Sequence, residues 1–435
     1  MRPTTRKQAT EAAKTVQLAG GRPVAAEGAA AQDVSIACGR IRFTGHADVR
    51  LDVREHLIFP GLVNAHDHLH RNAIPVFPHS RPFANSYCWA EAFQAHFENP
   101  AVIAVRALPT ELLYRHGGLK NMLSGVTAVA HHDPWNPALN DRYFPVRLLR
   151  RYGWCHSLEL GQERPGKRRF GPDVRESFAA TPKATAWIIH LAEGADEVAG
   201  AELETLAAMG CLAENTVLVH GVGLSHRDLD RVIEAGAAVV WCPASNLSML
   251  GKTLDPRRLY NSGRLALGTD SRLTGSSDML EELRVAERHS DLTAAELFRL
   301  ATTGSARTIR MPRSGALAQA WLADLFLARD RGGCPYSQLL QLRRRDLRAV
   351  VRAGTPAIAD PDLEVWFRAC GIEPLAVILD GAPKLMDPRY AGPAGALALE
   401  PGLELGHTVS SQCPQAPAAR AVPNGGWNTA QAGHA

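Results

Sequence analysis

The order of apolar and polar residues changes character twice along the chain. Residues 34–53 alternate apolar and polar positions over short stretches, with a turn at Gly39-Arg40, as strands of a hairpin do. From residue 57 to about residue 311, apolar runs alternate with longer amphipathic segments, which indicates strands and helices in turn. After Pro312 the short-strand pattern returns. The pattern therefore predicts an α/β section with parallel strands, with β structure on both sides of it.

The α/β section offers seven strand candidates and one gap. The strands are expected at residues 61–65, 126–130, 154–158, 186–191, 216–219, 237–241 and 264–267. Helices are expected at residues 202–209, 227–234, 278–287 and 294–302, with Thr293 and Glu296 forming a capping box for the last. Residues 161–182 are basic, contain Gly and Pro and lack an apolar run, so an eighth strand there, the fourth in order, would be short or degenerate. Later strands are expected at residues 322–328, 347–353 and 375–379.

Composition narrows the function classes. The chain has 435 residues, 46% of them hydrophobic and 21% charged, as a globular protein does. With 48 Lys and Arg against 44 Asp and Glu, the net charge of +4 gives no support to a nucleic-acid or membrane partner. Residues 1–18 lack the apolar run of a secretory signal, and the eight cysteines form no C-x-x-C pair. We expect a reduced, cytoplasmic protein with a disordered tail over residues 404–435.

Two histidines provide the strongest local signal. His66 and His68 stand two residues apart at the end of an extended apolar run. Because side chains of a strand alternate with a period of two, both imidazoles lie on the same side. That arrangement offers two nitrogen ligands to one metal ion. Taken alone it indicates a hydrogen-bonded histidine pair equally well, since H-x-H is a short string.

Other strands of the section also end in polar residues. His190 and His220 each close an apolar run, and Asp270 follows a third. The carboxyl ends of parallel strands in a barrel meet at one mouth, so these side chains are expected to converge with His66 and His68. Glu193, three residues past His190, either returns over the same site or stabilises the first turn of a helix.

Two other kinds of catalytic site are not supported by the sequence. No G-x-S-x-G elbow supports a nucleophilic serine. No G-x-G-x-x-G follows a strand and no Walker A lysine is present, so a nucleotide-phosphate loop has no support either.

Five motifs in this order resemble one known family. They are Pro60-Gly61-Leu62-Val63-Asn64-Ala65-His66-Asp67-His68, His190-Leu191-Ala192-Glu193, His220-Gly221-Val222, Cys242-Pro243-Ala244-Ser245-Asn246 and Gly268-Thr269-Asp270-Ser271. The set is similar to the amidohydrolase superfamily, closest to the branch with cytosine, guanine and S-adenosylhomocysteine deaminases and the triazine hydrolases. The resemblance covers about residues 32–385. It implies a distorted (β/α)₈ TIM barrel over residues 60–311 and a small β-sandwich domain built from residues 1–59 and 312–403.

The resemblance also implies a set of site residues. One divalent metal ion, zinc foremost and iron as the other option, would be bound by His66, His68, His190 and Asp270. Glu193 would shuttle protons and His220 would polarise the reacting group. Members with two metals use a carboxylated lysine or a glutamate in mid-barrel. Residues 154–160 hold no lysine and only Glu159 as a carboxylate, so one metal is expected.

The expected reaction is hydrolysis of a carbon–nitrogen bond. A bound divalent ion lowers the pKa of its water to about 7, so that a hydroxide can attack an amino-substituted purine, pyrimidine or related ring. Asp270 would accept the water proton, and Glu193 would pass a proton to the leaving nitrogen. The alternatives are opening of a cyclic amide, displacement of another ring substituent, or a non-catalytic scaffold on the same fold.

The residues expected to contact the substrate rest on weaker signals. His131 and His132 follow the strand at 126–130, Arg272 lies two residues past Asp270, and Trp89 and Ser245-Asn246 are further options. Arg272 would pair with an anionic substrate group. His131 and His132 are also candidates for a second metal site. The expected partner is a small molecule, and the resemblance allows a homo-oligomer.

Overall fold

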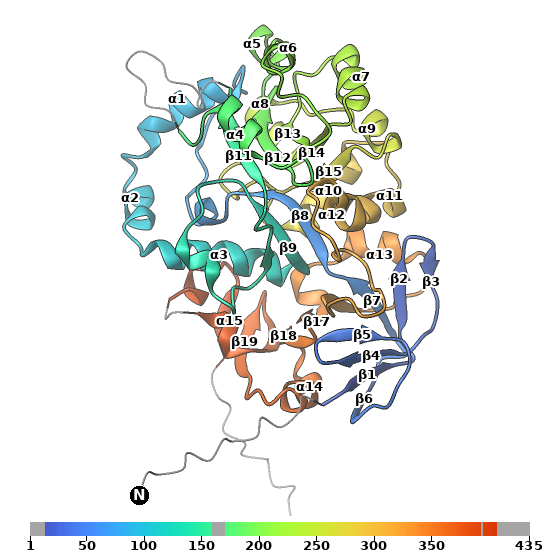
Figure 1. Cartoon of the computed structure of the whole chain (residues 1–435). Helices are drawn as coiled ribbons and strands as arrows, with labels where there is room; N and C mark the ends of the chain where they lie inside the picture. The colour runs from blue at the N-terminus through green and yellow to red at the C-terminus, as the bar shows by residue number, and fades with distance from the viewer. Residues whose placement is uncertain (1–13, 159–169, 393–394, 407–435) are drawn as a thin grey trace, which may run out of the picture.

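The computed structural model describes residues 14–158, 170–392 and 395–406. Its centre consists of two parallel sheets with strand orders β10-β9-β8 and β11-β12-β13-β14-β15 (Figure 1). The bounds are β8 (Leu62–Asp67), β9 (Val126–His131), β10 (Arg147–Leu148), β11 (Gly153–Ser157), β12 (Trp187–Leu191), β13 (Thr216–His220), β14 (Ala238–Trp241) and β15 (Leu265–Leu267). All seven predicted runs are strands, so the predicted α/β fold with parallel strands is confirmed.

The expected eighth strand is absent from the part of residues 161–182 that the structure describes. In the described part of residues 161–182 the structure has helix α4 (Val174–Ala180) and no strand, while residues 161–169 lie outside the described residues. The additional parallel strand is β10, which pairs with β9 before that segment begins. A strand of two residues, Arg147 and Leu148, is too short to produce a hydrophobic period.

The two parallel sheets share one apolar core. Alternate residues of their strands point into it, among them Val63 of β8, Ala128 of β9, Ile188 of β12 and Val240 of β14, all fully buried. Past the end of β15, the Asp270 amide donates to the His66 carbonyl at 3.1 Å. The carboxyl ends of β8 and β15 are therefore held side by side.

Helices follow and surround these strands. The predicted helices appear as α6 (Glu202–Ala208), α7 (His226–Glu234), α10 (Met279–Arg288) and α11 (Ala294–Arg299), the last continuing as a π-helix over Leu300–Gly304. The expected capping box of Thr293 and Glu296 is present. The remaining helices are α1 (Ser86–His96), α2 (Pro100–Arg106), α3 (Thr110–Leu123), α5 (Glu197–Gly200), α8 (Pro243–Leu250), α9 (Arg257–Asn261), α12 (Ser305–Thr308), α13 (Pro335–Gln341), α14 (Glu364–Ala369) and α15 (Pro388–Ala391).

Segments from both ends of the chain form the β structure. A nine-stranded sheet has the order β21-β19-β20-β18-β17-β16-β7-β2-β3, and a four-stranded sheet has the order β5-β4-β1-β6. The bounds are β1 (Val16–Ala19), β2 (Arg22–Ala25), β3 (Gly28–Ala29), β4 (Val34–Ala37), β5 (Arg40–Arg42), β6 (Val49–Asp52), β7 (His56–Pro60), β16 (Leu325–Arg329), β17 (Leu347–Arg352), β18 (Thr355–Ala359), β19 (Leu375–Leu379), β20 (Ala382–Met386) and β21 (Leu403–Leu405).

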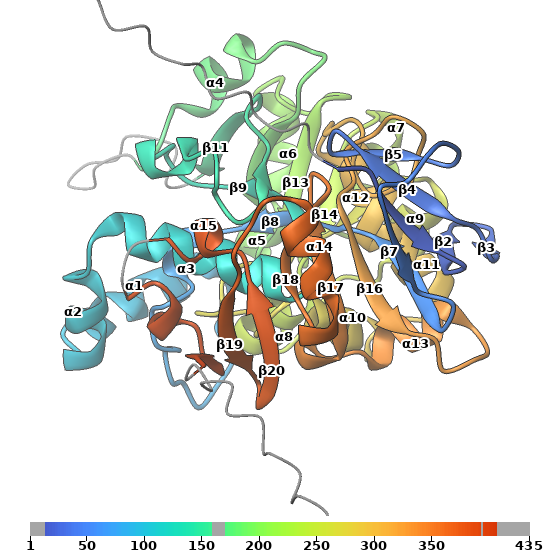
Figure 2. The ribbon, with the colours of Figure 1, turned by 90° about the horizontal axis from the view of Figure 1, so that it is seen from below.

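Strand β7 joins the two chain ends because it pairs antiparallel with β16 (Figure 2). One buried cluster, which includes Leu18, Ile58, Leu325 and Trp366, packs residues of both sheets together. Strand β21 extends to Leu405, so the first two residues of the predicted tail are ordered, and residues 407–435 lie outside the described residues.

Two further findings concern the cysteines and the helices. All seven cysteines in the described ranges are free thiols. Within the same ranges, no helix combines the length and the apolar character that a membrane crossing requires.

Candidate active site

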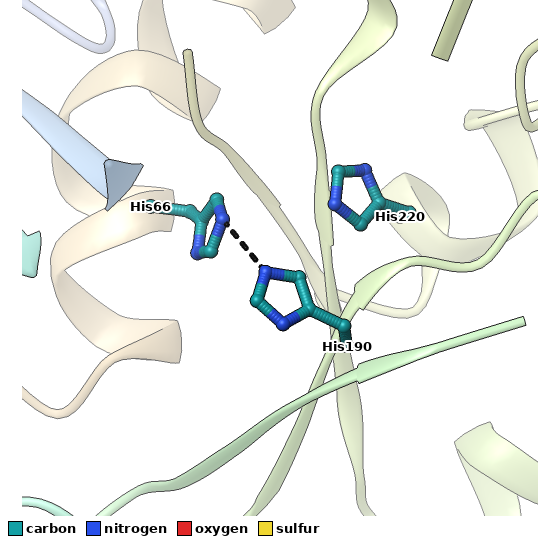
Figure 3. Close-up of side chains that lie close together, drawn as sticks. All are labelled: His66, His190 and His220. Atoms are coloured by element: carbon teal, nitrogen blue, oxygen red, sulfur yellow. Dashed lines mark hydrogen bonds between the residues drawn. The ribbon is translucent and has the colours of Figure 1, made fainter. Parts of the chain in front are cut away.

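The predicted metal ligands converge at the carboxyl ends of the parallel strands. His66 and His68 come from β8, His190 from β12, and Asp270 follows β15. The His190 Nε2 atom lies 3.3 Å from His66 Nε2 (Figure 3) and 3.2 Å from His68 Nε2. One carboxylate oxygen of Asp270 lies 3.9 Å from His66 Nε2 and 3.7 Å from His68 Nε2. All four residues are buried, so the side chains surround one point inside the protein.

Strained backbone conformations occur at the carboxyl ends of these strands. Ala192, His220 and Asp270 adopt left-handed conformations with φ of +53°, +77° and +54°. Such conformations cost non-glycine residues roughly 1–2 kcal/mol each and persist where the surrounding structure enforces them. Gly268 allows the close approach of the two strands, because a Cβ there would lie 2.7 Å from the His66 Cβ. These left-handed conformations turn the backbone sharply after each strand, where the side chains of His220, Glu193 and Asp270 line the same cavity.

Hydrogen bonds at the outer nitrogens fix two ring tautomers. The Nδ1 atom of His68 lies 2.5 Å from Asp133 Oδ2, and the Nδ1 atom of His190 lies 2.7 Å from the His156 carbonyl. Both neighbours are acceptors, so each Nδ1 carries the hydrogen and each Nε2 presents a lone pair. The two lone pairs then face each other across 3.2 Å.

A metal cation would relieve the repulsion between the Nε2 lone pairs of His68 and His190 more readily than a proton would. Burial, with a contribution from the neighbouring imidazoles, holds the pKa of His190 well below its ordinary value, which disfavours a proton there. Nitrogen and carboxylate donors of this kind suit zinc and other divalent transition metals. The residues present therefore fit a divalent metal ion.

Glu193 and His220 form a second pair beside these donors. Glu193 Oε1 lies 3.2 Å from His220 Nε2, while His220 Nδ1 lies 2.8 Å from Asn246 Oδ1. With the Asn246 oxygen as acceptor, Nδ1 of His220 carries the hydrogen and Nε2 accepts one. Burial raises the pKa of Glu193, which favours its neutral form as the donor to that nitrogen. The pair can hold and transfer a proton.

A cavity of about 620 Å³ leads to this cluster. Its lining includes His68, His190, Glu193, His220 and Asp270. Its wall is largely apolar and aromatic, with Trp89 and Phe93 of α1 stacked at 4.8 Å between ring centroids. The cavity is large enough for a small heterocyclic molecule, and its aromatic wall suits a planar ring.

Comparisons with known proteins agree with this geometry. The model of the amidohydrolase family matches residues 175–357. A protein named 5-methylthioadenosine/S-adenosylhomocysteine deaminase from Pyrococcus furiosus is 26% identical over 364 residues, covering 68% of this chain and 81% of that protein. An adenosine deaminase from Xanthomonas campestris with bound zinc has a TM-score of 0.63 at 20% identity, over 79% of this chain and 92% of that chain. The matched segment is similar to the amidohydrolase family and covers less than half of this chain.

Some matches to amidohydrolases are shorter. The protein from Pyrococcus abyssi that carries the same deaminase name is 33% identical over 155 residues. That alignment spans 32% of this chain and 36% of the relative. The similarity to the amidohydrolase superfamily therefore rests on the motifs, the fold and the site together, rather than on one long match.

Of the six residues expected to contact substrate, only Trp89 is among the residues that line the active-site cavity, while Ser245 and Asn246 instead bond to Asp270 and His220. Trp89 lines the cavity, whereas His131, His132 and Arg272 do not. The His131 ring packs 5.4 Å from that of Tyr114, and its Nδ1 accepts from the Leu69 amide. His132 Nε2 lies 3.0 Å from the Cys155 carbonyl, and its ring stacks at 4.4 Å on that of His190. His132 therefore supports a metal ligand from behind, and His131 packs outside the cavity.

Arg272 has an internal partner instead of a substrate anion. Its two terminal nitrogens donate to Glu400 at 2.7 and 2.9 Å. The sequence could not reveal this pairing, since the two residues lie 128 positions apart. Conversely, His156 lines the cavity and was missed, although it stands in the predicted strand at 154–158. Glu159, the weak candidate for a second metal, lies outside the described residues.

A fully buried lysine stabilises the back of the site. Lys120 Nζ lies 3.1 Å from Asp67 Oδ2 and 3.2 Å from the carbonyl oxygen of Asp270. Removing one partner of a buried ion pair leaves the other charge uncompensated. We expect Lys120→Met to lower the free energy of unfolding by about 3 kcal/mol or more. The exposed Lys252→Met variant should change it little, and equal urea midpoints for the two variants would contradict the assignment.

Glu400 is expected to make the stability of the folded protein depend on pH in the acid range. It is buried against Arg272, Arg344 and His116. Burial alone would raise the pKa of Glu400. The opposite effect is larger: hydrogen bonds from His116 and Arg272, together with the charge of Arg272, lower this pKa to about 2. A carboxylate with a lowered folded-state pKa contributes stability that is complete above its unfolded pKa and is lost as the pH falls toward the folded value.

Replacing Glu400 tests that contribution. Glu400→Gln should cost roughly 3 kcal/mol of unfolding free energy at pH 7, where the wild-type carboxylate is charged in both states. The difference in unfolding free energy between wild type and variant should begin to shrink as the pH falls below about 4.5. Below that pH the wild type gradually loses the stability that the charged Glu400 carboxylate contributes. Urea denaturation at pH 7, 5 and 4 measures this, and a difference that grows toward acid pH would contradict it.

Proposed function

We propose that this chain is a metal-dependent deaminase that acts on an amino-substituted heterocycle. The observation that carries the proposal is the pair of Glu193 and His220, 3.2 Å apart, which lines an apolar cavity beside the proposed metal ligands. The possible ligands form two groups that share His66: one with His68 and Asp270, the other with His190 and His220. The cavity would hold the ring, and the pair would handle the proton that the leaving nitrogen needs. The deaminase names of the relatives support the same reaction class.

The proposed metal site consists of His66, His68, His190 and Asp270. We favour zinc over iron because the similar adenosine deaminase carries zinc. When bound, the ion supplies a water of lowered pKa and polarises the substrate. The chain's own part is to hold the donors in place through Asp133 and the His156 carbonyl.

Asp270 is proposed to accept the proton from the attacking water. Its Oδ2 accepts hydrogen bonds from Ser245 Oγ at 2.7 Å and Thr274 Oγ1 at 2.9 Å. These bonds orient the carboxylate and leave its Oδ1 facing the histidines. A fixed acceptor avoids reorganisation during the reaction.

Glu193 is proposed to deliver a proton to the leaving nitrogen. Burial raises the pKa of Glu193 and so favours a proton there, and His220, oriented by Asn246, would stabilise the charge that develops on the attacked ring once its Nε2 is protonated. The aromatic wall with Trp89 and Phe93 would stack on the ring and exclude water.

Release of ammonia tests the proposal. The zinc-loaded protein would be incubated with 5-methylthioadenosine, S-adenosylhomocysteine, adenosine, guanine, cytosine and aminotriazines, while ammonia and product masses are followed. Stoichiometric ammonia and a hydroxylated ring from at least one compound are expected. Products of ring opening, or loss of a substituent other than an amine, would favour the alternative hydrolases. A protein that binds no metal and turns over nothing would favour a scaffold.

We further propose that the two parallel sheets are arcs of one distorted (β/α)₈ barrel over residues 60–311. Their shared apolar core and the bond from Asp270 to His66 support closure between β15 and β8. The chain ends, residues 1–59 and 312–403, would form a small β-sandwich domain beside it. A stable fragment lacking the β-sandwich segments would show that the barrel does not need them.

A further inference from the structure

A second cavity lies at the opposite end of the parallel strands from the candidate active site. Its volume is about 390 Å³. It is lined by residues at the amino ends of three strands: Thr216 and Val217 of β13, Ala238 of β14, and Arg264, which precedes β15. Because β13 ends at His220, this cavity and the active site lie at opposite ends of the same strand.

Positive charge dominates the lining. Arg264, Arg307 and Arg310 contribute to it, and Glu214 is its one carboxylate. Glu214 is a weak partner, because its side chain is 79% exposed and lies 3.4 Å from Arg310 Nη2. In the described ranges, Arg264 and Arg307 form no ion pair with a carboxylate. The cavity therefore carries a net excess of positive charge.

Two of the three guanidinium groups are held in place without being neutralised. Arg264 Nη1 donates to the Gly236 carbonyl at 2.7 Å, and Arg310 Nη2 donates to the Glu214 carbonyl at 2.8 Å. Carbonyl oxygens orient a guanidinium but carry no net charge. Gly263 leaves room for Arg307, because a Cβ at this left-handed position would lie 3.3 Å from Arg307 Nη2. Arg307 is exposed, and its Nη2 lies 3.5 Å from the Gly263 carbonyl. Two oriented guanidinium groups and a third that is free to adjust suit an anion with several oxygens.

We propose that this cavity binds a small molecule that carries a phosphate group. The phosphate oxygens would accept charge-assisted hydrogen bonds from Arg264, Arg307 and Arg310, and the volume leaves room for the rest of a small metabolite. The site is independent of the proposed deaminase reaction, since none of its lining residues lines the active-site cavity.

Calorimetric titration of the zinc-loaded full chain with inorganic phosphate and pyrophosphate tests the proposal. The wild type is expected to bind in a saturable manner at low ionic strength, with pyrophosphate the tighter ligand. Arg307→Gln should raise the dissociation constant about tenfold, and the Arg264→Gln/Arg307→Gln double variant should show no saturable binding. Arg307→Lys keeps the charge but loses the forked donor, so its affinity should fall between those of wild type and Arg307→Gln.

Arg258→Gln is the matched control. It removes the same charge from an exposed residue of α9 that pairs with Asp230 outside the cavity, so anion binding should be unchanged. Equal binding by the wild type and the double variant would overturn the proposal. The proposal would also be overturned if Arg258→Gln lost as much anion affinity as the cavity variants, because that would indicate unspecific charge attraction. Binding that persists in the double variant but disappears when the metal is removed would assign the anion to the metal centre. That result would also overturn the proposal.

Discussion

An Asp270→Ala variant should lose both its metal and its turnover. Asp270 is the carboxylate among the four proposed metal ligands, and it is also the proposed acceptor for the water proton. Without it, three buried imidazoles would have to hold a divalent charge with no negative ligand. We expect the metal content to fall to less than about a tenth of the wild-type value and kcat/KM to fall by roughly 10⁴-fold or more.

Elemental analysis of the purified variant, together with steady-state kinetics, measures both losses. His289→Ala serves as the control because His289 is exposed at the end of α10, and it should keep full metal and full activity. Far-UV circular dichroism and a urea titration would show that Asp270→Ala is folded. A metal-free Asp270→Ala protein with wild-type activity would end the proposal of a metal-dependent reaction.

A Glu193→Gln variant should separate chemistry from metal binding. Glutamine keeps the size and polarity of the side chain beside His220 but cannot release a proton to the leaving nitrogen. Since Glu193 is not among the proposed ligands, the metal content should stay at the wild-type level. The turnover number should fall by about 10²–10⁴-fold, the range that a positioned general acid supplies.

The matched control for Glu193→Gln lies four residues further along. Glu197 begins α5 and is exposed, so Glu197→Gln removes the same charge without touching the site. It should retain full turnover. Loss of metal in Glu193→Gln would make Glu193 a ligand, and unchanged turnover would remove it from the mechanism. Either result would require a different donor for the leaving nitrogen.

The sequence predicted which side chains would lie together at the site because strand geometry is local. A period of two puts His66 and His68 on one side of a strand, and the carboxyl ends of parallel strands share one edge. These rules need no knowledge of distant contacts, so the apolar runs before His190 and Asp270 were enough to predict that both would lie beside that pair. The same rules did not settle His131 and His132, because strand β9 ends at His131 and the chain beyond it turns.

The substrate contacts depend on pairings that no local pattern contains. Arg272 seemed free to bind an anion, but Glu400 approaches it from the far end of the chain. Lys120 gives no signal in α3, yet its amine is buried against Asp67. Burying a charge is costly without a partner, so each of these residues takes the partner that the packing supplies.

The sequence by itself determined the succession of strands and which residues stand at their carboxyl ends as proposed metal ligands. Only the tertiary structure decided which histidines face the cavity, which tautomers His68 and His190 adopt, and that Arg272 is engaged internally. The physical reason is the range of the interactions. Periodicity and turn chemistry act over a few residues, whereas burial, charge compensation and cavity shape depend on segments that meet only after the chain has folded.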